Sequence, residues 1–554
     1  MKVKSIKDAI HGYIRLEEPF WKIIDTAEFQ RLKWIEQTSY RVLYPSARHD
    51  RFIHSIGVYH LGQKAIQGFL NNCDDKDAEI VKKYKYSFLL ACLLHDIGHA
   101  PFSHTCENLF SYKEKINNKN SKINKELLAE IKSHLDDPAY HVFEKDYFSL
   151  IMKNPPAPHE IMSSIITCRK FGDYNKFFES ENINSLNLDL IVRSIIGCCY
   201  SYKRTDDEDK RLELGIKNCL IRLLNSSTVD VDKLDYIARD TQMSGYDSIV
   251  LDNKRLLDNV CIVDNDGIYY PAFGKGALSV LNNVVIAKNS QAKWIINHPV
   301  VIYEAYLLCK AIGISLANSG LRNTDNVVLS SDEIINFIFS SASLSKEGHQ
   351  YFGGKFRLLS DVEILNLMKS HMEYSVVSEY FSRDERKSPV WKSSEEFLYC
   401  LDSNEDKAAE VAEYMAPLIN FFNNVDDITD LRQIDSKILL DDSLNERQDK
   451  ETVQNLINVL LEYHPDTSYV ILPAKNTFYA RIDADKLYIR FGNVSQNYTT
   501  YKKLEGEDKG ALDKRYSFFY LYSSKKIDPK KFLEYLYDLS LIHISEPTRR
   551  RGIS

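Results

Sequence analysis

The segment LLACLLHDIGHAPFSH, residues 89–104, decides the fold of this chain. Its leucines recur with helical spacing, which predicts an apolar helix that ends at His95 and Asp96. An adjacent imidazole and carboxylate suit a buried core poorly, because an unpaired buried charge is costly. They suit a divalent metal ion well, since nitrogen and carboxylate oxygen are ligands that such ions accept.

An acidic run, DVDKLDYIARD at residues 230–240, carries a second group of polar side chains. On a helix Asp232, Tyr236 and either Arg239 or Asp240 lie on one face, and Lys233 lies one step round, where it could reach a phosphate. The alternative is a solvated helix laced with Asp–Lys and Asp–Arg pairs. Taken alone the run favours that alternative, but beside the His–Asp pair we prefer a ligand-binding face.

Four side chains could close one metal site: His54, His95, Asp96 and Asp232. Two neutral imidazoles and two carboxylates balance a divalent charge and leave positions for water and a phosphate oxygen. A lone histidine such as His54 is usually an ordinary residue, and only the joint pattern argues for ligation. We therefore predict a metal-dependent phosphohydrolase that uses manganese, iron, magnesium or zinc.

Composition restricts the class of protein. The chain has 554 residues and a net charge of −7, and its ten cysteines form no CxxC pair. We expect more than one domain and a reduced, cytoplasmic protein. No uninterrupted apolar run reaches the length of a membrane span, so no membrane partner is expected. Nucleic acid is disfavoured as a partner, although a local basic cleft stays open.

The pattern predicts a mainly α protein, with a helical catalytic domain at residues 1–385 and a smaller mixed α/β domain at 386–539. Polar stretches at 113–137 and 203–211 are interpreted as surface insertions or mobile loops. Asp25 is expected to cap the helix that carries Phe29. Further helices are expected at 300–316, at 361–369 and from Pro529, and strands at 469–472, 487–491 and 516–522. Residues 540–554 resemble a translated adapter sequence, so we interpret them as a non-native tail, with a natural basic tail as the alternative.

Four segments together resemble the HD-domain superfamily and, within it, the dNTP triphosphohydrolases, which include the SAM-and-HD-domain dNTPase and bacterial dGTPase-like proteins. The segments are DAIHGYIRLEEPFWKIIDTAEFQRLKWIEQ at 8–37, RFIHSIGVYHLG at 51–62, LLHDIGHAPFSH at 93–104 and DVDKLDYIARD at 230–240. The resemblance extends to near residue 385, and no SAM domain is expected before it. It implies an HD-domain helical catalytic core.

The resemblance also implies roles for individual residues. The metal ligands fall on the four residues named above, and the histidine that faces the scissile ester falls on His104, with Glu107 and His159 as helpers. Glu107 stands where a close relative has Asp, which lengthens the arm. Contacts to the phosphates and the sugar fall on Gln37, Arg51, Lys233, Tyr236, Asp240, Lys288 and His298.

The implied reaction is hydrolysis of a dNTP at the α-phosphorus, which gives a deoxynucleoside and inorganic triphosphate. Lys288 replaces an Arg of the family and Ile296 replaces a Tyr, so the preferred base stays open. Positions that bind an activating nucleotide in regulated relatives fall on Asp25, Gln30 and Lys33. Such activation would imply a symmetric homo-oligomer, a dimer or a tetramer.

Two alternatives remain at this point. An HD-type nuclease or cyclic-nucleotide phosphodiesterase would share the metal site, but would be expected to show a wider basic cleft. A non-catalytic nucleotide sensor would bind without cutting, and the complete set of candidate ligands argues against it. For a dNTP-hydrolysing enzyme, control of nucleotide pools or defence against phage is the expected role.

Overall fold

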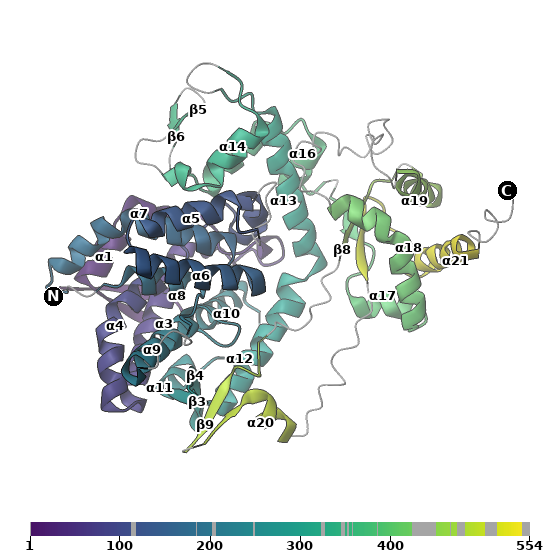
Figure 1. Cartoon of the computed structure of the whole chain (residues 1–554). Coiled ribbons are helices and arrows are strands. Elements are labelled where there is room, and N and C mark those ends of the chain that lie inside the picture. The colour runs from purple at the N-terminus through teal and green to yellow at the C-terminus, as the bar shows by residue number, and fades with distance from the viewer. Residues whose placement is uncertain are drawn as a thin grey trace, which may run out of the picture. The chain divides into compact units, whose positions relative to one another are not determined.

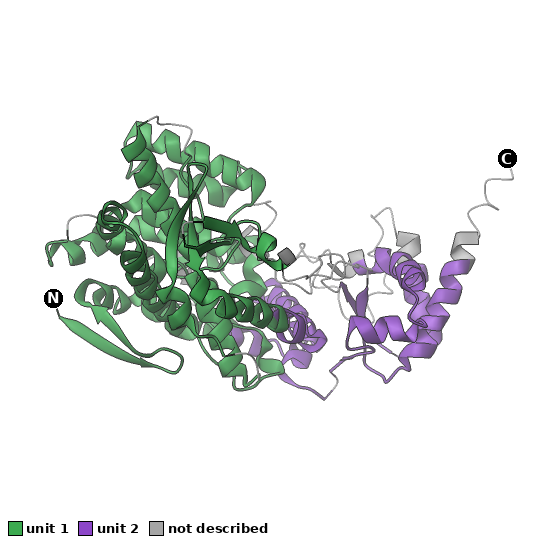
Figure 2. Ribbon diagram, turned by 90° about the horizontal axis from the view of Figure 1, so that it is seen from below, with its two compact units in different colours: residues 1–291, 321–364, 480–508 green, residues 292–320, 365–479, 509–554 purple. Residues whose placement is uncertain are grey.

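The computed structural model describes residues 2–111, 118–183, 186–201, 207–246, 250–322, 327–344, 349–351, 354–356, 358–384, 386–423, 450–465, 467–473, 482–492, 494–504 and 518–545. The chain divides into two compact units (Figure 2). Unit 1 contains residues 1–291, 321–364 and 480–508. Unit 2 contains residues 292–320, 365–479 and 509–554.

Unit 1 is mainly helical (Figure 1). Its α-helices are α1 Glu18–Ile24, α2 Ala27–Gln30, α3 Arg51–Asn72, α4 Asp75–Leu94, α5 Lys122–Lys132, α6 Asp137–Lys153, α7 Pro158–Glu179, α8 Leu188–Ile196, α9 Glu208–Leu224, α10 Val231–Ser244, α11 Asn253–Asp258, α12 Leu278–Gln291, α14 Ser331–Ile338 and α20 Tyr498–Leu504. Its 3-10 helices are η1 Arg31–Trp34, η2 Tyr40–Val42, η3 Ser103–Ser111, η5 Lys275–Ala277 and η7 Ser341–Leu344.

Three small sheets accompany these helices. The first is an antiparallel hairpin of β1 Val3–Asp8 and β2 Gly12–Glu17. The second has the order β10-β9-β4-β3, built from β3 Val260–Asn265, β4 Ile268–Gly274, β9 Tyr488–Phe491 and β10 Val494–Asn497. The third pairs β5 His349–Tyr351 with β6 Gly354–Phe356. Because β4 and β9 pair in parallel, a segment far along the chain completes a sheet of unit 1.

The helices α3 and α4 form the centre of unit 1 and position the functional residues. Asp50 caps α3 by accepting a hydrogen bond from the backbone N–H of Ile53 (3.0 Å), and Asp74 caps α4 in the same way. The last turns of α4 are fully buried, and burial of each leucine there stabilises the fold by about 2 kcal/mol. A rigid apolar helix therefore ends at the His–Asp pair.

Unit 2 packs helices around a three-stranded sheet of order β7-β11-β8. Trp391 is fully buried there and donates from its indole N–H to the carbonyl of Phe519 (2.6 Å). The elements of unit 2 are η6 Ala292–Ile296 (a π-helix), α13 Pro299–Asn318, α16 Ser375–Phe381, β7 Ser388–Pro389, α17 Ser394–Cys400, α18 Glu405–Asn423, α19 Lys450–Tyr463, β8 Tyr469–Pro473, β11 Phe519–Ser523 and α21 Pro529–Ser545. The helix α15, Asp361–Lys369, begins in unit 1 and ends in unit 2.

Helix α13 alone among the described helices is long and apolar enough to meet the length and composition of a membrane span. Its mean hydropathy is 1.7, and 61% of it is buried within the protein. It also carries Glu304 and Lys310. Buried core helices pass the same test, so this feature is weak evidence for a membrane. Sequence analysis predicted the helix but not its similarity to a membrane span, because these two charged residues interrupt the apolar run.

The mainly α class is confirmed, as are the helices expected at 300–316 and 361–369, the helix that begins at Pro529 and the strands near 469–472 and 487–491. The strand expected at 516–522 is observed as β11 from Phe519, and residue 516 lies outside the described residues. Of the expected tail at 540–554, residues 540–545 continue α21 and the rest lies outside the described residues. The two units interleave along the chain, whereas a single boundary near residue 385 was expected.

One local prediction was wrong, and two polar stretches whose interpretation as insertions stays a prediction contain helical residues. The polar stretch at 113–137 contains helix α5, because Ile123, Leu127 and Ile131 recur at helical spacing and are buried. The stretch at 203–211 includes the first turn of α9, which Asp207 caps. Asp25 does not begin the helix of Phe29: it ends α1, and Thr26 occupies the N-cap position of α2.

Candidate metal centre and proton-transfer group

The four candidate ligands come together at the ends of three helices. His54 lies in the first turn of α3, His95 caps the C-terminus of α4 with Asp96 directly after it, and Asp232 lies in the first turn of α10. The Nε2 atom of His54 lies 3.0 Å from Oδ1 of Asp232 and 3.5 Å from Oδ2 of Asp96. The Nε2 atom of His95 lies 3.4 Å from Oδ1 of Asp96 and 3.6 Å from Oδ1 of Asp232. Two imidazoles and two carboxylates thus converge on one point.

Two observations indicate that this point suits a cation. The Nε2 atoms of His54 and His95 are buried and have no hydrogen-bond partner within the described part of the chain. Desolvation raises the pKa of Asp232, but His54 and His95 outweigh this effect and hold the pKa well below its ordinary value. The residues therefore fit a divalent metal, which would satisfy both nitrogen atoms.

Groups behind the ligands fix their orientation. The Nδ1–H of His54 donates to Oδ2 of Asp235 (2.7 Å), and the Nδ1–H of His95 donates to the carbonyl of Cys92 (3.0 Å). Both bonds leave the lone pair of Nε2 pointing at the centre. Arg51 donates to Oδ2 of Asp96 (2.7 Å), and against desolvation it holds the pKa of that carboxyl well below its usual range.

Gly98 allows the turn after Asp96 to lie directly on helix α7. A Cβ atom at this position would come within 2.3 Å of the backbone nitrogen of Ser163. The backbone N–H of Gly98 also donates to Oγ of Ser163 (2.9 Å). This close approach brings the following segment, with His104, next to His159 at the start of α7.

His104, Glu107 and His159 form a hydrogen-bonded group beside the metal centre. One oxygen of Glu107 accepts from Nδ1 of His104 (2.9 Å), and the other accepts from Nδ1 of His159. Desolvation raises the pKa of Glu107, but the two histidines outweigh this effect and hold the pKa well below its ordinary value. Although burial lowers it, Glu107 raises the pKa of His159 to about 9. The His104 side chain is 58% exposed, so its Nε2 atom is the one that could reach a ligand.

His99 links this group to the metal centre, a role that the sequence did not reveal. Its Nε2 atom lies 3.2 Å from Oδ1 of Asp96, and its ring stacks on His159 at 4.1 Å between centroids. The three histidines 99, 104 and 159 lie close enough to hold a cation themselves.

The expected substrate contacts lie partly around the same centre. Lys233 pairs with Asp230 and donates to the carbonyl of Ser226 (2.8 Å). Desolvation and then Lys233 lower the pKa of Lys288 to about 8, so two ammonium groups face the same region. Tyr236 is half-buried on α10, one turn after Asp232.

Two further expected contacts, Asp240 and Gln37, are buried. Asp240 is held by His49 (2.7 Å) and by Gln291 (2.9 Å). The backbone carbonyl of Gln37 accepts from Arg51 (3.3 Å). Their predicted contacts with a sugar stay predictions.

The remaining expected positions, His298 among them, stay predictions. His298 belongs to unit 2, where it accepts a hydrogen bond from the backbone of Val300 at the start of α13. Gln30 and Lys33 contact each other (2.7 Å), whereas Asp25 pairs with Lys4 (3.2 Å). A nucleotide site at Asp25, Gln30 and Lys33 stays a prediction.

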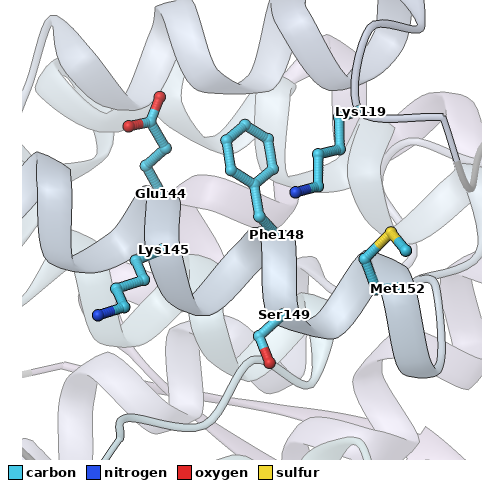
Figure 3. Close-up of a pocket in the computed structure, with 6 residues that line it drawn as sticks. All are labelled: Lys119, Glu144, Lys145, Phe148, Ser149 and Met152. Carbon is cyan, nitrogen blue, oxygen red and sulfur yellow. The ribbon is translucent and has the colours of Figure 1, made fainter.

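A separate surface pocket of about 380 Å³ lies on α6 (Figure 3). Phe148 lies against Lys119, whose ammonium is 4.8 Å from the ring centroid. The lining residues are Lys119, Glu144, Lys145, Phe148, Ser149 and Met152. This pocket carries a single carboxylate and no histidine, so it lacks the ligands of a metal site.

Sequence reasoning also missed Asp235 and His11, and it placed Arg239 only as a possible member of the polar face. Asp235 lies three residues after Asp232 and is fully buried. A ligating histidine needs a hydrogen-bond partner at its second nitrogen, and this requirement is the signal that could have identified Asp235. His11 lies within the segment at 8–37 that carries the resemblance, which is the only hint in the sequence.

Comparisons with known proteins agree with this geometry. Residues 51–155 match the model of the HD domain. The chain is 28% identical over 294 residues (52% of this chain, 55% of that protein) to "Uncharacterized protein MG461" of Mycoplasma genitalium. It is 23% identical over 374 residues (67% and 60%) to "Uncharacterized protein MJ1154" of Methanocaldococcus jannaschii.

A shorter similarity has a higher identity. The chain is 42% identical over 110 residues to the deoxynucleoside triphosphate triphosphohydrolase SAMHD1 of Xenopus laevis, which is 20% of this chain and 17% of that protein. The chain thus spans only part of the curated relatives that it matches, with 55% and 60% of the length of the first two. Residues 51–155 thus match the HD domain, and the histidine and aspartate cluster is consistent with a divalent metal.

Proposed function

We propose that this protein is a metal-dependent dNTP triphosphohydrolase. The observation that carries the proposal is the cluster of His54, His95, Asp96 and Asp232 beside the hydrogen-bonded pair His104–Glu107. A phosphohydrolase needs an activated water and a proton donor for the leaving oxygen, and these two groups suit those tasks. The partial similarity to a triphosphohydrolase of dNTPs favours this substrate class over other phosphate esters.

His54, His95, Asp96 and Asp232 would hold a divalent cation, which would supply a Lewis acid to activate water and polarise a phosphoryl oxygen. Water oxygen forms a bond to the α-phosphorus, and the bond from that phosphorus to the 5′ oxygen breaks. His104 gives a proton from Nε2 to the departing 5′ oxygen, and Glu107 keeps the ring in the required orientation through Nδ1. The products are a deoxynucleoside and inorganic triphosphate.

Charge around the cluster supports a polyphosphate as substrate. Lys233 and Lys288 lie close enough for the charge of one to lower the pKa of the other. Repulsion between ammonium groups is relieved when an anion binds between them. In the proposal they hold the phosphates, while Tyr236 and Asp240 face the deoxyribose.

Hydrolysis in water enriched in oxygen-18 tests the position of attack. Attack at the α-phosphorus places the heavy oxygen in the triphosphate and none in the deoxynucleoside, as read by mass spectrometry. Label in a monophosphate or a diphosphate product would instead show cleavage between phosphates, and the proposed reaction would be wrong. A His104→Ala variant serves as the background control.

A further inference from the structure

A buried network lies behind the metal centre and is centred on Asp235. Its Oδ2 atom accepts from Nδ1 of His54 (2.7 Å) and from Nε of Arg239 (2.8 Å). Its Oδ1 atom accepts from Nε2 of His11 (2.6 Å) and from Nη2 of Arg239 (2.9 Å). Asp235 and Arg239 have no exposed surface. The carboxylate is therefore fully committed to holding its neighbours.

The network reaches the N-terminal hairpin. Arg239 donates from Nη1 to Oδ2 of Asp8 (2.9 Å), the last residue of β1. The other oxygen of Asp8 accepts from the backbone N–H groups of Ile10 (2.8 Å) and His11 (2.7 Å). Asp8 thus shapes the turn that presents His11 to Asp235. The turn between β1 and β2 is in this way linked to the ring of His54 by consecutive hydrogen bonds.

Gly57 shows how closely this network is packed. It lies one turn after His54 on α3, and a Cβ atom there would come within 2.0 Å of Oδ1 of Asp235 and 2.5 Å of Nη2 of Arg239. Glycine inside a helix costs about 1 kcal/mol relative to alanine. A residue without a side chain at this position leaves room for the buried carboxylate and guanidinium.

We propose that Asp235 is a positioning residue for His54, and that the β1–β2 hairpin holds Asp235 in place through His11 and Asp8. The inference rests on the proposed metal centre. A carboxylate on the second nitrogen of a ligating histidine fixes its tautomer and orientation and makes it a better donor to the metal. Loss of such a partner weakens metal affinity by about 10- to 100-fold.

Direct measurement of metal binding tests this role without any substrate. The full chain is stripped of metal with a chelator and titrated with Mn²⁺. Calorimetry and the electron paramagnetic resonance signal of the bound ion measure the binding. We expect Asp235→Asn to bind Mn²⁺ about 10- to 100-fold more weakly than the wild type. Asp146→Asn is the matched control, because Asp146 is also a buried partner of an arginine, Arg193. It should keep wild-type affinity.

A second pair of variants covers the case in which Asp235→Asn does not fold. Gly57→Ala should weaken Mn²⁺ binding because its methyl group displaces Asp235, whereas Gly172→Ala, which meets open space on α7, should not. His11→Ala should weaken binding by a smaller factor, since Arg239 still holds the carboxylate.

The outcomes separate this inference from the proposed function. The positioning role would be overturned, whatever the reaction, if folded Asp235→Asn or Gly57→Ala protein had the same Mn²⁺ affinity and the same resonance spectrum as the wild type. A wild type that binds no Mn²⁺ would overturn both. Weaker binding by these variants, with unchanged binding by Asp146→Asn and Gly172→Ala, supports the positioning role even if dNTPs are not the substrate.

Discussion

Arg51 donates from Nη1 to Oδ2 of Asp96 over 2.7 Å, and both side chains are buried. Its other nitrogens reach Oγ of Ser103 (3.0 Å) and the carbonyl of Gln37 (3.3 Å). The resemblance to dNTP triphosphohydrolases implied that Arg51 binds phosphate. The structure shows a guanidinium that uses its planar geometry to hold a candidate metal ligand.

The variant Arg51→Lys separates these two roles. A single ammonium group cannot replace three directed contacts, so we expect roughly tenfold weaker Mn²⁺ binding and lower kcat. Binding is measured by calorimetry on the metal-free protein. If Arg51 serves phosphate alone, KM will rise while Mn²⁺ affinity stays the same. Arg169→Lys is a suitable control because Arg169 pairs with Glu126 and Glu130 on the surface.

The variant His104→Ala should lower kcat by about 10²- to 10⁴-fold, the usual contribution of a general acid. The four candidate ligands remain intact, so Mn²⁺ affinity should not change. Steady-state kinetics and metal titration measure the two quantities on one preparation. The control is His141→Ala, because His141 is exposed and also lies beside a glutamate, Glu144. Unchanged kcat in His104→Ala would exclude the proposed proton donor.

The ion pair between His159 and Glu107 should make stability depend on pH. The pKa of His159 is raised to about 9 from an ordinary value of 6.5, so its contribution is complete below pH 6.5 and is lost as the pH rises through 9. The pKa of Glu107 is lowered, so its contribution is present above its ordinary value of 4.5 and is lost in acid.

Thermal unfolding of the metal-free wild type and of Glu107→Gln measures this effect. We expect the wild type to be more stable near pH 6 by on the order of 1–3 kcal/mol, and the difference to shrink between pH 6.5 and 9. A difference that stays constant over this range would mean that His159 carries no raised pKa.

The variant Gly98→Ala should destabilise the protein by about 1–3 kcal/mol or more, because its Cβ would overlap the backbone of Ser163. Gly172→Ala, in the middle of α7, should be neutral or stabilising by up to roughly 1 kcal/mol. Chemical denaturation measures both. Equal stability of the two variants would show that the turn after Asp96 yields more easily than its close packing indicates.

Local patterns were enough to predict two of the three helices that carry the ligands, α4 and α10. The leucines before His95 and the polar face of α10 each lie within one element, where helical spacing is informative. The structure brings His54, His95, Asp96 and Asp232 together as the sequence suggested. Their identity as ligands stays a prediction until a metal is measured.

Relationships across long sequence distances could not be predicted. His11 and Asp235 are 224 residues apart, and no periodicity connects them. The parallel pairing of β4 with β9 joins residues near 272 and 488, so a segment expected in the C-terminal domain completes a sheet of unit 1. Asp25 was misplaced because a cap depends on backbone angles at one residue, and Thr26 rather than Asp25 has the extended angles there.

The most direct test of the central claim is product analysis of the purified chain with Mn²⁺ and each dNTP, alone and in mixtures, beside Asp96→Asn. We expect equal amounts of deoxynucleoside and intact triphosphate from the wild type and neither from the variant. Activity in mixtures alone would add nucleotide activation to the account. No release of triphosphate from any dNTP by Mn²⁺-loaded protein, together with cleavage of single-stranded nucleic acid or a cyclic nucleotide, would contradict it.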